Sequence, residues 1–453
     1  MTGTLVGSMA GVCCLLATFL LHKRPNALFG LLLVCLLIGP LGTVDIGVKR
    51  IPLLAVDLYL PSWLLVAICF PHQWHMPRYV KQAIFALSAF VVTATLTSAL
   101  YAPDGMKALW TLKNYLEGLT ALYLIGTSLR TRPHLQTAAT SLYVFGAAMV
   151  IELIAVSYQT AGGHLWAGLA QSKNLARTTF GQSNYVAGFL ILAMPFAMVS
   201  LRRSSLHRLC AGAAFVLLVL GLVITASRGA MLSIAVVAAF ALIRQPKRLL
   251  IGFLVVLALA AIALSAVPEE FVSSLQESFS RLNADPNTLQ RLAVWGTSWT
   301  VFLDHPVLGI GLKASGFEFL ANVGVAYHTD AHNFVLTLLC ETGLFGTTFY
   351  LMAMWGCFRG GLRALASCSL PADRLLIRGC LLGVCASTLH SLVEILHGAA
   401  EYSVLIWSVL GLAACAPEIL REASPALGEP GAGDWSAAAL ASIAVVPNDE
   451  LIS

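Results

Sequence analysis

The chain has 453 residues, of which 58% are hydrophobic and only 11% are charged. A soluble domain carries about 25% charged residues, so one water-facing globule could not bury this much apolar surface, and lipid must surround most of it. Stretches such as 249–267 are continuously apolar, whereas the strands of a β-barrel alternate apolar and polar residues. The composition therefore predicts an all-α polytopic integral membrane protein.

Apolar segments recur along the whole chain. A transmembrane span needs about 20 apolar residues; segment 26–41 is shorter than this, and segment 52–70 contains Asp57 and Pro61. The first segment is followed, and not preceded, by basic residues, which indicates an uncleaved first span and not a signal peptide. The candidate segments lie near 3–21, 26–41, 52–70, 83–101, 114–129, 137–156, 184–201, 208–225, 230–243, 249–267, 333–357, 375–395 and 402–417.

Basic residues are distributed unevenly between alternate loops. Most of the 27 Lys and Arg residues lie in the loops after the odd-numbered segments, although the intervening loops are longer. The positive-inside rule assigns the basic loops to the cytoplasm and the others to the periplasm or exterior. About thirteen spans with an outer N-terminus fit this pattern, and so do about twelve with an inner N-terminus if one early segment does not cross. We favour twelve.

Segment lengths define the domain organisation. A continuous helix over 208–243 would be about 54 Å long, against a hydrocarbon core of about 30 Å, so we expect a turn near Arg228–Gly229 at the outer surface. The stretch 268–332 is a sizeable outward loop with helix-like pieces at 269–282 and 289–303, and none of the eleven cysteines lies in it. No disulfide framework is expected. Residues 1–417 should form one transmembrane domain, and 418–453 a disordered tail.

His332 is the first candidate for chemistry. It lies where the outward loop enters an apolar segment, just after Asp330, a candidate N-cap. The partial positive charge of a helix N-terminus favours a neutral imidazole, and a neutral histidine at the membrane surface can accept a proton from a hydroxyl. A helix-capping or interfacial histidine explains the same position.

Arginines on the outer face form the second candidate group. Arg228, Arg291 and Arg177 all fall in outward loops, although this face has few basic residues. Forked guanidinium donors suit a diphosphate, which they can bind in pairs. Binding of lipid headgroups, or salt bridges within the protein, are the alternatives for each arginine taken singly.

Several other site types are excluded or unsupported. Gly309 and Gly311 resemble a nucleotide loop, but no strand precedes them and no phosphate-loop lysine follows, so they predict a tight turn. Gly343 and Gly346 indicate close helix packing. The chain contains no Asp-x-Asp and no histidine–carboxylate spacing typical of a metal site, so we expect no metal or other cofactor. The location of the basic residues does not favour nucleic acid.

Four segments together resemble the O-antigen ligases of the bacterial O-antigen ligase/polymerase superfamily. They are RTTFGQSNYVAG from Arg177, TASRGAML around Arg228, RLAVWGTSWTVFLDHPVLGIG from Arg291, and AHNFVLTLLCETGLFG around His332. Each is weak alone, but their order and separation match, and together they cover about 170–350.

The resemblance implies an inverting, metal-independent membrane glycosyltransferase of the inner membrane with a periplasmic active site. It would transfer O-antigen from undecaprenyl diphosphate to the lipid A–core oligosaccharide, with membrane lipids around it. The positions of His332, Arg228 and Arg291 would be essential, and Arg177 carries over less directly. His332 would be the base, and the arginines would bind the diphosphate.

Other activities are compatible with the same sequence features. An O-antigen polymerase, a protein O-oligosaccharyltransferase or a small-sugar ligase would share these motifs, although protein-glycosylating members tend to have larger periplasmic portions. A transporter would need ionisable groups near the midplane of the bilayer. Asp57, Glu117, Glu152 and Glu394 are the candidates within apolar segments. The clustering of the other charges at one face favours interfacial chemistry.

Overall fold

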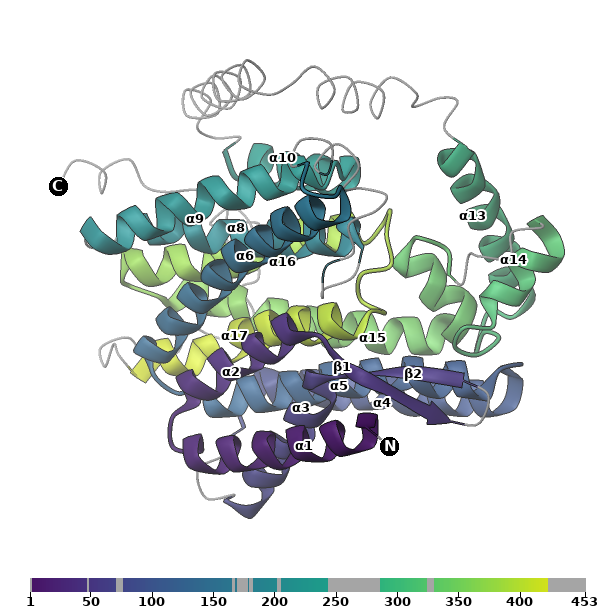
Figure 1. Ribbon diagram of the computed structural model, residues 1–453, viewed down its shortest axis with the longest axis horizontal. Helices are drawn as coiled ribbons and strands as arrows, with labels where there is room; N and C mark the ends of the chain where they lie inside the picture. The colour runs from purple at the N-terminus through teal and green to yellow at the C-terminus, as the bar shows by residue number, and fades with distance from the viewer. Residues whose placement is uncertain are drawn as a thin grey trace.

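The computed structural model describes residues 2–46, 49–70, 76–164, 168, 178, 182–201, 205–242, 286–323 and 330–422. These ranges are mainly helical (Figure 1). In chain order the helices are α1 (Thr2–Leu21), α2 (Pro25–Ile38), α3 (Ala55–Cys69), α4 (Arg78–Tyr101), α5 (Gly105–Ser128), α6 (Arg132–Thr160), α8 (Ser183–Ser200), α9 (Ser205–Ile224), α10 (Arg228–Leu242), α13 (Pro286–Asp304), α14 (Ser315–Val323), α15 (Phe334–Ser367), α16 (Pro371–His390) and α17 (Ala400–Glu422).

The predicted fold class is confirmed. Within the described ranges, 6 helices are long and apolar enough to cross a membrane, namely those of α4, α6, α8, α9, α15 and α17. Shorter apolar helices occur in α1, α2, α3 and α10. The protein is therefore an all-α polytopic membrane protein. The number of spans stays a prediction, because segment 249–267 lies outside the described residues.

The helices form two packed groups that lie roughly parallel in Figure 1. One group packs α4 and α5 against α15 and α17, and the other contains α6, α8, α9, α10 and α16. Because α16 contacts both α8 and α17, it joins the two groups. Aromatic rings fill the first group: Tyr350 lies 5.0 Å from Phe90 and 5.3 Å from Trp407 between ring centroids.

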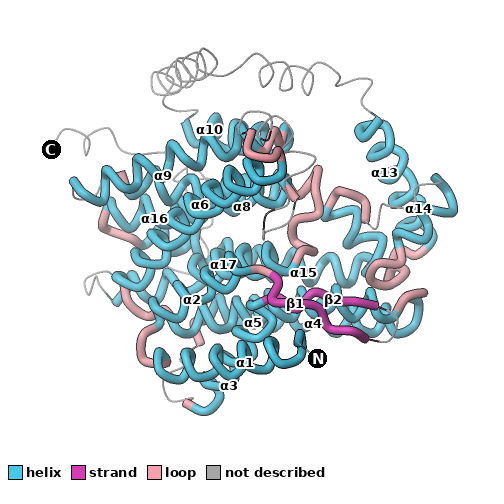
Figure 2. The backbone as a smooth tube through the Cα atoms, in the orientation of Figure 1, coloured by secondary structure: helices cyan, strands magenta, loops and turns pink. Residues whose placement is uncertain are grey.

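A short β-hairpin, not anticipated from the sequence, connects α2 to α3 (Figure 2). Strands β1 (Pro40–Ile46) and β2 (Lys49–Leu54) pair antiparallel, with Val44 opposite Ile51. The β-branched residues of both strands suit this extended conformation. The hairpin brings Asp57, in the first turn of α3, to the end of β2, where its carboxylate accepts a 2.9 Å hydrogen bond from the Leu54 amide.

The long apolar stretch 208–243 is divided as the length argument predicts. Helix α9 ends at Ile224, and α10 begins at Arg228. Ala226 between them has a φ of 47°, which reverses the chain within three residues. Gly229 then packs tightly against α16: a Cβ there would lie 2.6 Å from Val393 Cγ2 and 3.1 Å from His390 Nδ1. The turn therefore places the start of α10 beside the loop after α16.

Helix α15 is broken at Gly343, whose φ of 62° and ψ of −165° are accessible essentially only to glycine. The loop after α13 binds at this break. The amides of Ile310 and Gly311 donate to the carbonyls of Cys340 and Glu341 at 3.0 and 2.9 Å. Gly309 must lack a side chain, because a Cβ would lie 2.6 Å from the Cys340 carbonyl oxygen. The predicted tight turn at Gly309 and Gly311 is confirmed, and its role is to pair with α15.

The break divides α15 into a first arm before Gly343 and a second arm after it, and the first arm folds back beside the second. The Phe334 ring lies 5.0 Å from Tyr350 and 4.4 Å from His397 between centroids. Asn333, and not Asp330, caps this arm, since its side chain accepts from the Leu336 amide at 3.1 Å. The prediction of Asp330 as the cap is wrong because His332 has a φ of 46°, which delays the start of the helix to Phe334.

Candidate active site

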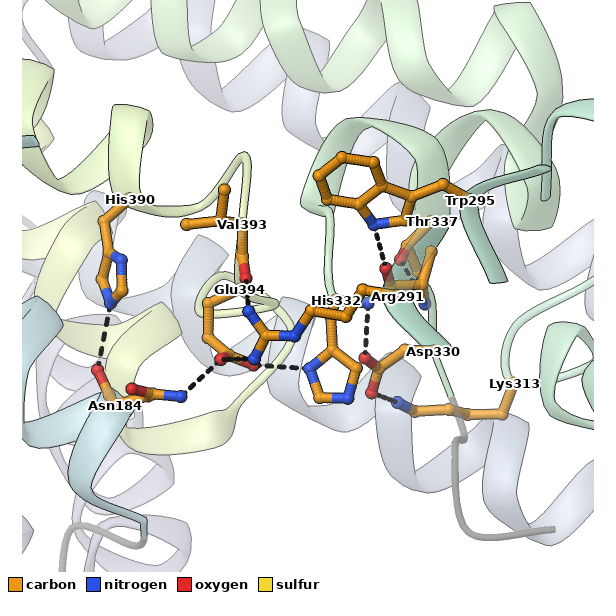
Figure 3. A network of polar contacts seen from close by, with 11 residues as sticks. Asn184, Arg291, Trp295, Lys313, Asp330, His332, Thr337, His390, Val393 and Glu394 are labelled. Atoms are coloured by element: carbon orange, nitrogen blue, oxygen red, sulfur yellow. Dashed lines mark hydrogen bonds and ion pairs between the residues drawn. The ribbon is translucent and has the colours of Figure 1, made fainter. Parts of the chain in front are cut away.

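Glu394 is the centre of a polar cluster that joins three separate parts of the chain (Figure 3). It lies in the non-helical segment 391–399 between α16 and α17. Its Oε1 accepts a hydrogen bond from His332 Nδ1 at 2.7 Å. Its Oε2 accepts from Arg291 at 3.1 Å and from the Asn184 side-chain amide at 2.6 Å. Both carboxylate oxygens are therefore bound, as a buried carboxylate requires.

His332 is held by its backbone neighbours. The Trp295 indole of α13 donates to the Ala331 carbonyl at 2.7 Å, and the Phe334 amide donates to the Ser391 carbonyl at 2.8 Å. The His332 amide donates to Asp330 Oδ1 at 3.1 Å. These contacts fix the left-handed backbone at His332, so the imidazole faces Glu394 with 24% of its side chain exposed.

Arg291 bridges the loop that carries Glu394. One terminal guanidinium nitrogen donates to the Val393 carbonyl at 3.0 Å, and the other forms the ion pair with Glu394. The planar fork matches this two-point contact, which a lysine could not reproduce. Arg291 therefore fixes both the backbone and the side chain of the segment opposite His332.

Asn184 ties the cluster to α8 and α16. It is the second residue of α8, and its own carbonyl accepts from His390 Nε2 at 3.3 Å. His390 ends α16, four residues before Glu394. The carboxylate is thereby connected to the group that contains α8 and α16, and His332, just before α15, connects it to the other group.

The shifted pKa values of His332 and Glu394 have a common cause. Burial acts to lower the pKa of His332, but the hydrogen bond and charge of Glu394, with Asp330, outweigh it and raise the pKa above its usual 6.5. Burial acts to raise the pKa of Glu394, but the hydrogen bond and charge of His332, with Arg291, leave it below its usual 4.5. The two directions agree, because the contact favours both the protonated form of the imidazole and the ionised form of the carboxylate. The prediction that the helix N-terminus favours neutral imidazole is wrong, because the nearest charge is this carboxylate.

The structure brings His332 and Arg291 together through Glu394. It places Arg228 at the first position of α10, next to Gly229, which packs on His390 and Val393. The backbone of Arg228 is thus at the edge of the same cluster. Arg177 and His328 lie outside the described residues.

Lys313 is a basic neighbour of the site that the sequence did not single out. Its ammonium forms a 3.5 Å ion pair with Asp330. Figure 3 shows this ammonium on the side of the His332 ring away from Glu394. Within the described ranges, no group of three or more His, Cys, Asp or Glu side chains is placed to hold a metal ion.

Glu394 and Asn184 are the residues that sequence reasoning missed. Glu394 was considered only as an acidic residue within an apolar segment, and Asn184 only as one residue of the RTTFGQSNYVAG segment that begins at Arg177. One signal could have indicated Glu394: a carboxylate in an apolar segment needs a cationic partner, and His332 and Arg291 were already assigned to one face.

The fold and the cluster define a polytopic membrane protein with a histidine–carboxylate pair at the centre of its polar cluster. Residues 213–351 match a protein-family model described as O-antigen ligase. The matched segment includes Arg228, Arg291 and His332. It is similar to the O-antigen ligase family, whose members are polysaccharide-transferring enzymes of the ligase/polymerase type. No curated protein gives a significant match to the chain.

Proposed function

We propose that this protein is an O-antigen ligase, which transfers polysaccharide from undecaprenyl diphosphate to lipid A–core oligosaccharide. The observation that carries the proposal is the Glu394 carboxylate, which binds His332 at 2.7 Å and Arg291 at 3.1 Å. His332 and Arg291 both lie in the segment that matches the O-antigen ligase model. A base and a cation held by one buried carboxylate suit the transfer of a sugar from a diphosphate to a hydroxyl.

His332 acts as the general base. With Nδ1–H donated to Glu394, the proton from the acceptor hydroxyl goes to Nε2. The acceptor oxygen then forms a bond to the anomeric carbon, from the face opposite the diphosphate, and inverts it. The carbon–oxygen bond to the diphosphate breaks, and the leaving group keeps the electron pair. Glu394 orients the imidazole and stabilises the imidazolium, as the buried carboxylate does in a catalytic triad.

The arginines stabilise the leaving undecaprenyl diphosphate. Arg291 uses two of its five N–H donors for Val393 and Glu394, and its other donors can bind phosphate oxygens. Arg228, at the first position of α10, and Arg177 complete the set. Charge that grows on the diphosphate is neutralised by these groups, so neither a metal nor a nucleotide takes part.

The uneven distribution of basic residues supports an inner-membrane location with the site on the periplasmic side. Transfer from a diphosphate needs no ATP, which agrees with that compartment. The modest length of the loop 268–332 favours lipid A–core over a protein as acceptor.

Reconstitution tests the proposal. Purified protein is mixed with undecaprenyl-diphosphate polysaccharide and lipid A–core, with chelator and without nucleotide. We expect a new high-mass lipopolysaccharide band that depends on His332. Elongated lipid-linked chains without attached acceptor would identify an O-antigen polymerase, and glycan on Ser or Thr of an added periplasmic protein would identify an O-oligosaccharyltransferase. Addition of a single sugar to the core would identify a small-sugar ligase.

A transporter is the alternative from another class, and the contacts of its candidate residues count against it. Lys113 forms ion pairs with Asp57 at 2.7 Å and with Glu117 at 3.0 Å. Glu394 is bound by His332, Arg291 and Asn184. The contact of Asp57 joins α3 to α5, that of Glu117 lies within α5, and those of Glu394 join separate parts of the chain, so all three carboxylates are engaged within the protein. Flux of lipid-linked glycan across vesicles without covalent transfer would favour the transporter.

A further inference from the structure

Helix α13 has an apolar exposed face. Its four large exposed side chains are Leu289, Leu292, Trp299 and Leu303, between 49% and 58% accessible. At 100° per residue they lie on one side of the helix, together with the smaller exposed residues Ala293, Gly296 and Thr300. None of these residues is charged. We call this set the Leu289–Leu303 face.

The opposite side of α13 carries its polar groups. Arg291 and the Trp295 indole point toward Glu394 and Ala331, and Ser298 is buried. A helix on the surface of a water-soluble protein shows the reverse arrangement, with apolar residues inward and charges outward. The polarity of α13 is that of a helix whose outer side contacts an apolar medium.

The two arms of α15 show how far the site lies from the turn at Gly343. Phe334 contacts Tyr350 although the chain turns at Gly343 between them. Tyr350 lies seven residues beyond the turn, about 10 Å along the helix. The start of the first arm, with His332 beside it, is therefore recessed by about this distance from the apex at Gly343.

Helix α13 extends from this recessed level to the apex. Near its start, Arg291 and Trp295 contact the recessed groups. Just after its end, the carbonyls of Pro306 and Val307 accept from the amides of Leu344 and Phe345 at 2.8 and 3.2 Å. The exposed polar residues Asp304 and His305 thus lie at the apex, and the apolar Leu289 and Leu292 lie at the recessed level. Figure 1 shows α13 at one end of the helix groups, apart from their centre.

The Leu289–Leu303 face is continuous with the exposed apolar surface of α15. Val307 and Leu308 are exposed where they meet Leu344 and Phe345, which are also exposed. Along the second arm of α15 this surface continues through Met352 and Trp355. Because α15 is a candidate membrane span, this exposed surface faces lipid.

We propose that the Leu289–Leu303 face is a lipid-contact surface, with α13 embedded among the acyl chains of the leaflet on the side of the site. The polar residues Asp304 and His305 then reach the headgroups, and the apolar residues lie deeper, as each prefers. His332, Arg291 and Glu394 consequently lie below headgroup level, shielded from lipid by α13. From the sequence alone, the whole of 268–332 was expected to lie outside the membrane.

Depth-dependent quenching tests the proposal. The exposed cysteines Cys13, Cys69 and Cys210 are replaced by serine in the full-length protein, and Leu292→Cys is labelled with bimane in lipid nanodiscs. We expect acyl-chain spin-labelled lipid to remove most of the fluorescence at this position and aqueous iodide to have little effect. Leu303→Cys provides a second position on the same face, should the first variant fold poorly.

Asn322→Cys is the matched control, because Asn322 is a polar exposed residue of α14 in the same loop. Iodide should quench it strongly and the lipid label weakly. The proposal is overturned if iodide quenches Leu292→Cys and Leu303→Cys as strongly as the control, since the face would then be in water. It is equally overturned if both labels are shielded from lipid and from iodide, since protein would then cover the face.

Discussion

Glu394 Oε1 lies 2.7 Å from His332 Nδ1, although 62 residues separate them in the chain. The contact joins the loop before α15 to the loop before α17. Since a carboxylate only accepts hydrogen bonds, Nδ1 carries the proton in this pair, and Nε2 is the nitrogen that can gain or lose one. The structure therefore defines one tautomer of His332 and one direction for proton transfer.

Replacement of the proposed base should strongly reduce transfer without loss of donor binding. For His332→Gln we expect transfer to fall by about 10²–10⁴-fold, the usual contribution of a general base. The glutamine amide can still donate to Glu394, so the loop should keep its conformation. Binding of the undecaprenyl-diphosphate donor, measured by thermal shift, should persist. Near-normal transfer by this variant would show that His332 is not the base.

The Glu394→Gln variant should change the pH dependence of transfer. If His332 is the general base as proposed, transfer requires its neutral form. The rate then rises as pH passes upward through the pKa of His332, which Glu394 raises above 6.5. Without that charge, burial remains the main influence and lowers the pKa, so the rising limb should move to lower pH. The maximum rate should also fall, because a weaker base is less effective. Glu394→Asp, which keeps the charge, is the control. If the rising limb of the pH–rate profile were unchanged in Glu394→Gln, Glu394 would not set the pKa of His332.

The two-point contact of Arg291 should not tolerate lysine. A lysine ammonium cannot reproduce the forked contact of 3.0 Å to Val393 and 3.1 Å to Glu394. We expect Arg291→Lys to lower stability by about 1.5–3 kcal/mol, the range for a hydrogen bond to a charged group, and to reduce transfer strongly. Thermal unfolding in detergent and the transfer assay measure the two effects. Full activity with lysine would mean that charge alone suffices.

The break in α15 should depend on Gly343. An alanine Cβ there would overlap the Val307 carbonyl, and the backbone conformation is unfavourable for any side chain. We expect Gly343→Ala to cost at least about 2 kcal/mol and to disturb the loop after α13. Gly296→Ala is the matched control, since nothing lies within 4 Å of a Cβ at that position. It should be neutral or stabilising by about 0.5–1 kcal/mol, as alanine is in a helix. Equal unfolding temperatures for the two variants would contradict this account.

Much of the helical framework follows from apolar patterning, but patterning does not locate the end of a helix inside an apolar run. The division of 208–243 was predictable because helix length is limited by bilayer thickness. The end of α16 at His390 was not, because the apolar segment continues to 395 while the helix does not. A change from helix to loop inside an apolar run depends on partners elsewhere in the chain. Here those partners include Phe334, whose amide donates to the Ser391 carbonyl.

The candidate site, too, depends on contacts between distant parts of the chain that local sequence does not predict. His332 and Arg291 could be assigned to one face because loops alternate in charge, and the structure places both beside Glu394. The pairing itself could not be predicted, since no sequence spacing relates Glu394 to a residue 62 positions earlier. The direction of the His332 pKa shift depends on that pairing and was therefore predicted wrongly.

Glu394 and Asn184 lie outside residues 213–351, the segment that matches the family model. The matched segment supplies His332 and Arg291 but neither the carboxylate that holds them nor the amide that holds the carboxylate. Exchange of this segment between two relatives would therefore combine the proposed base from one parent with the proposed orienting group from the other. Chimaeras that exchange it together with the loop 391–399 and the start of α8 should retain transfer more often than chimaeras that exchange the matched segment alone.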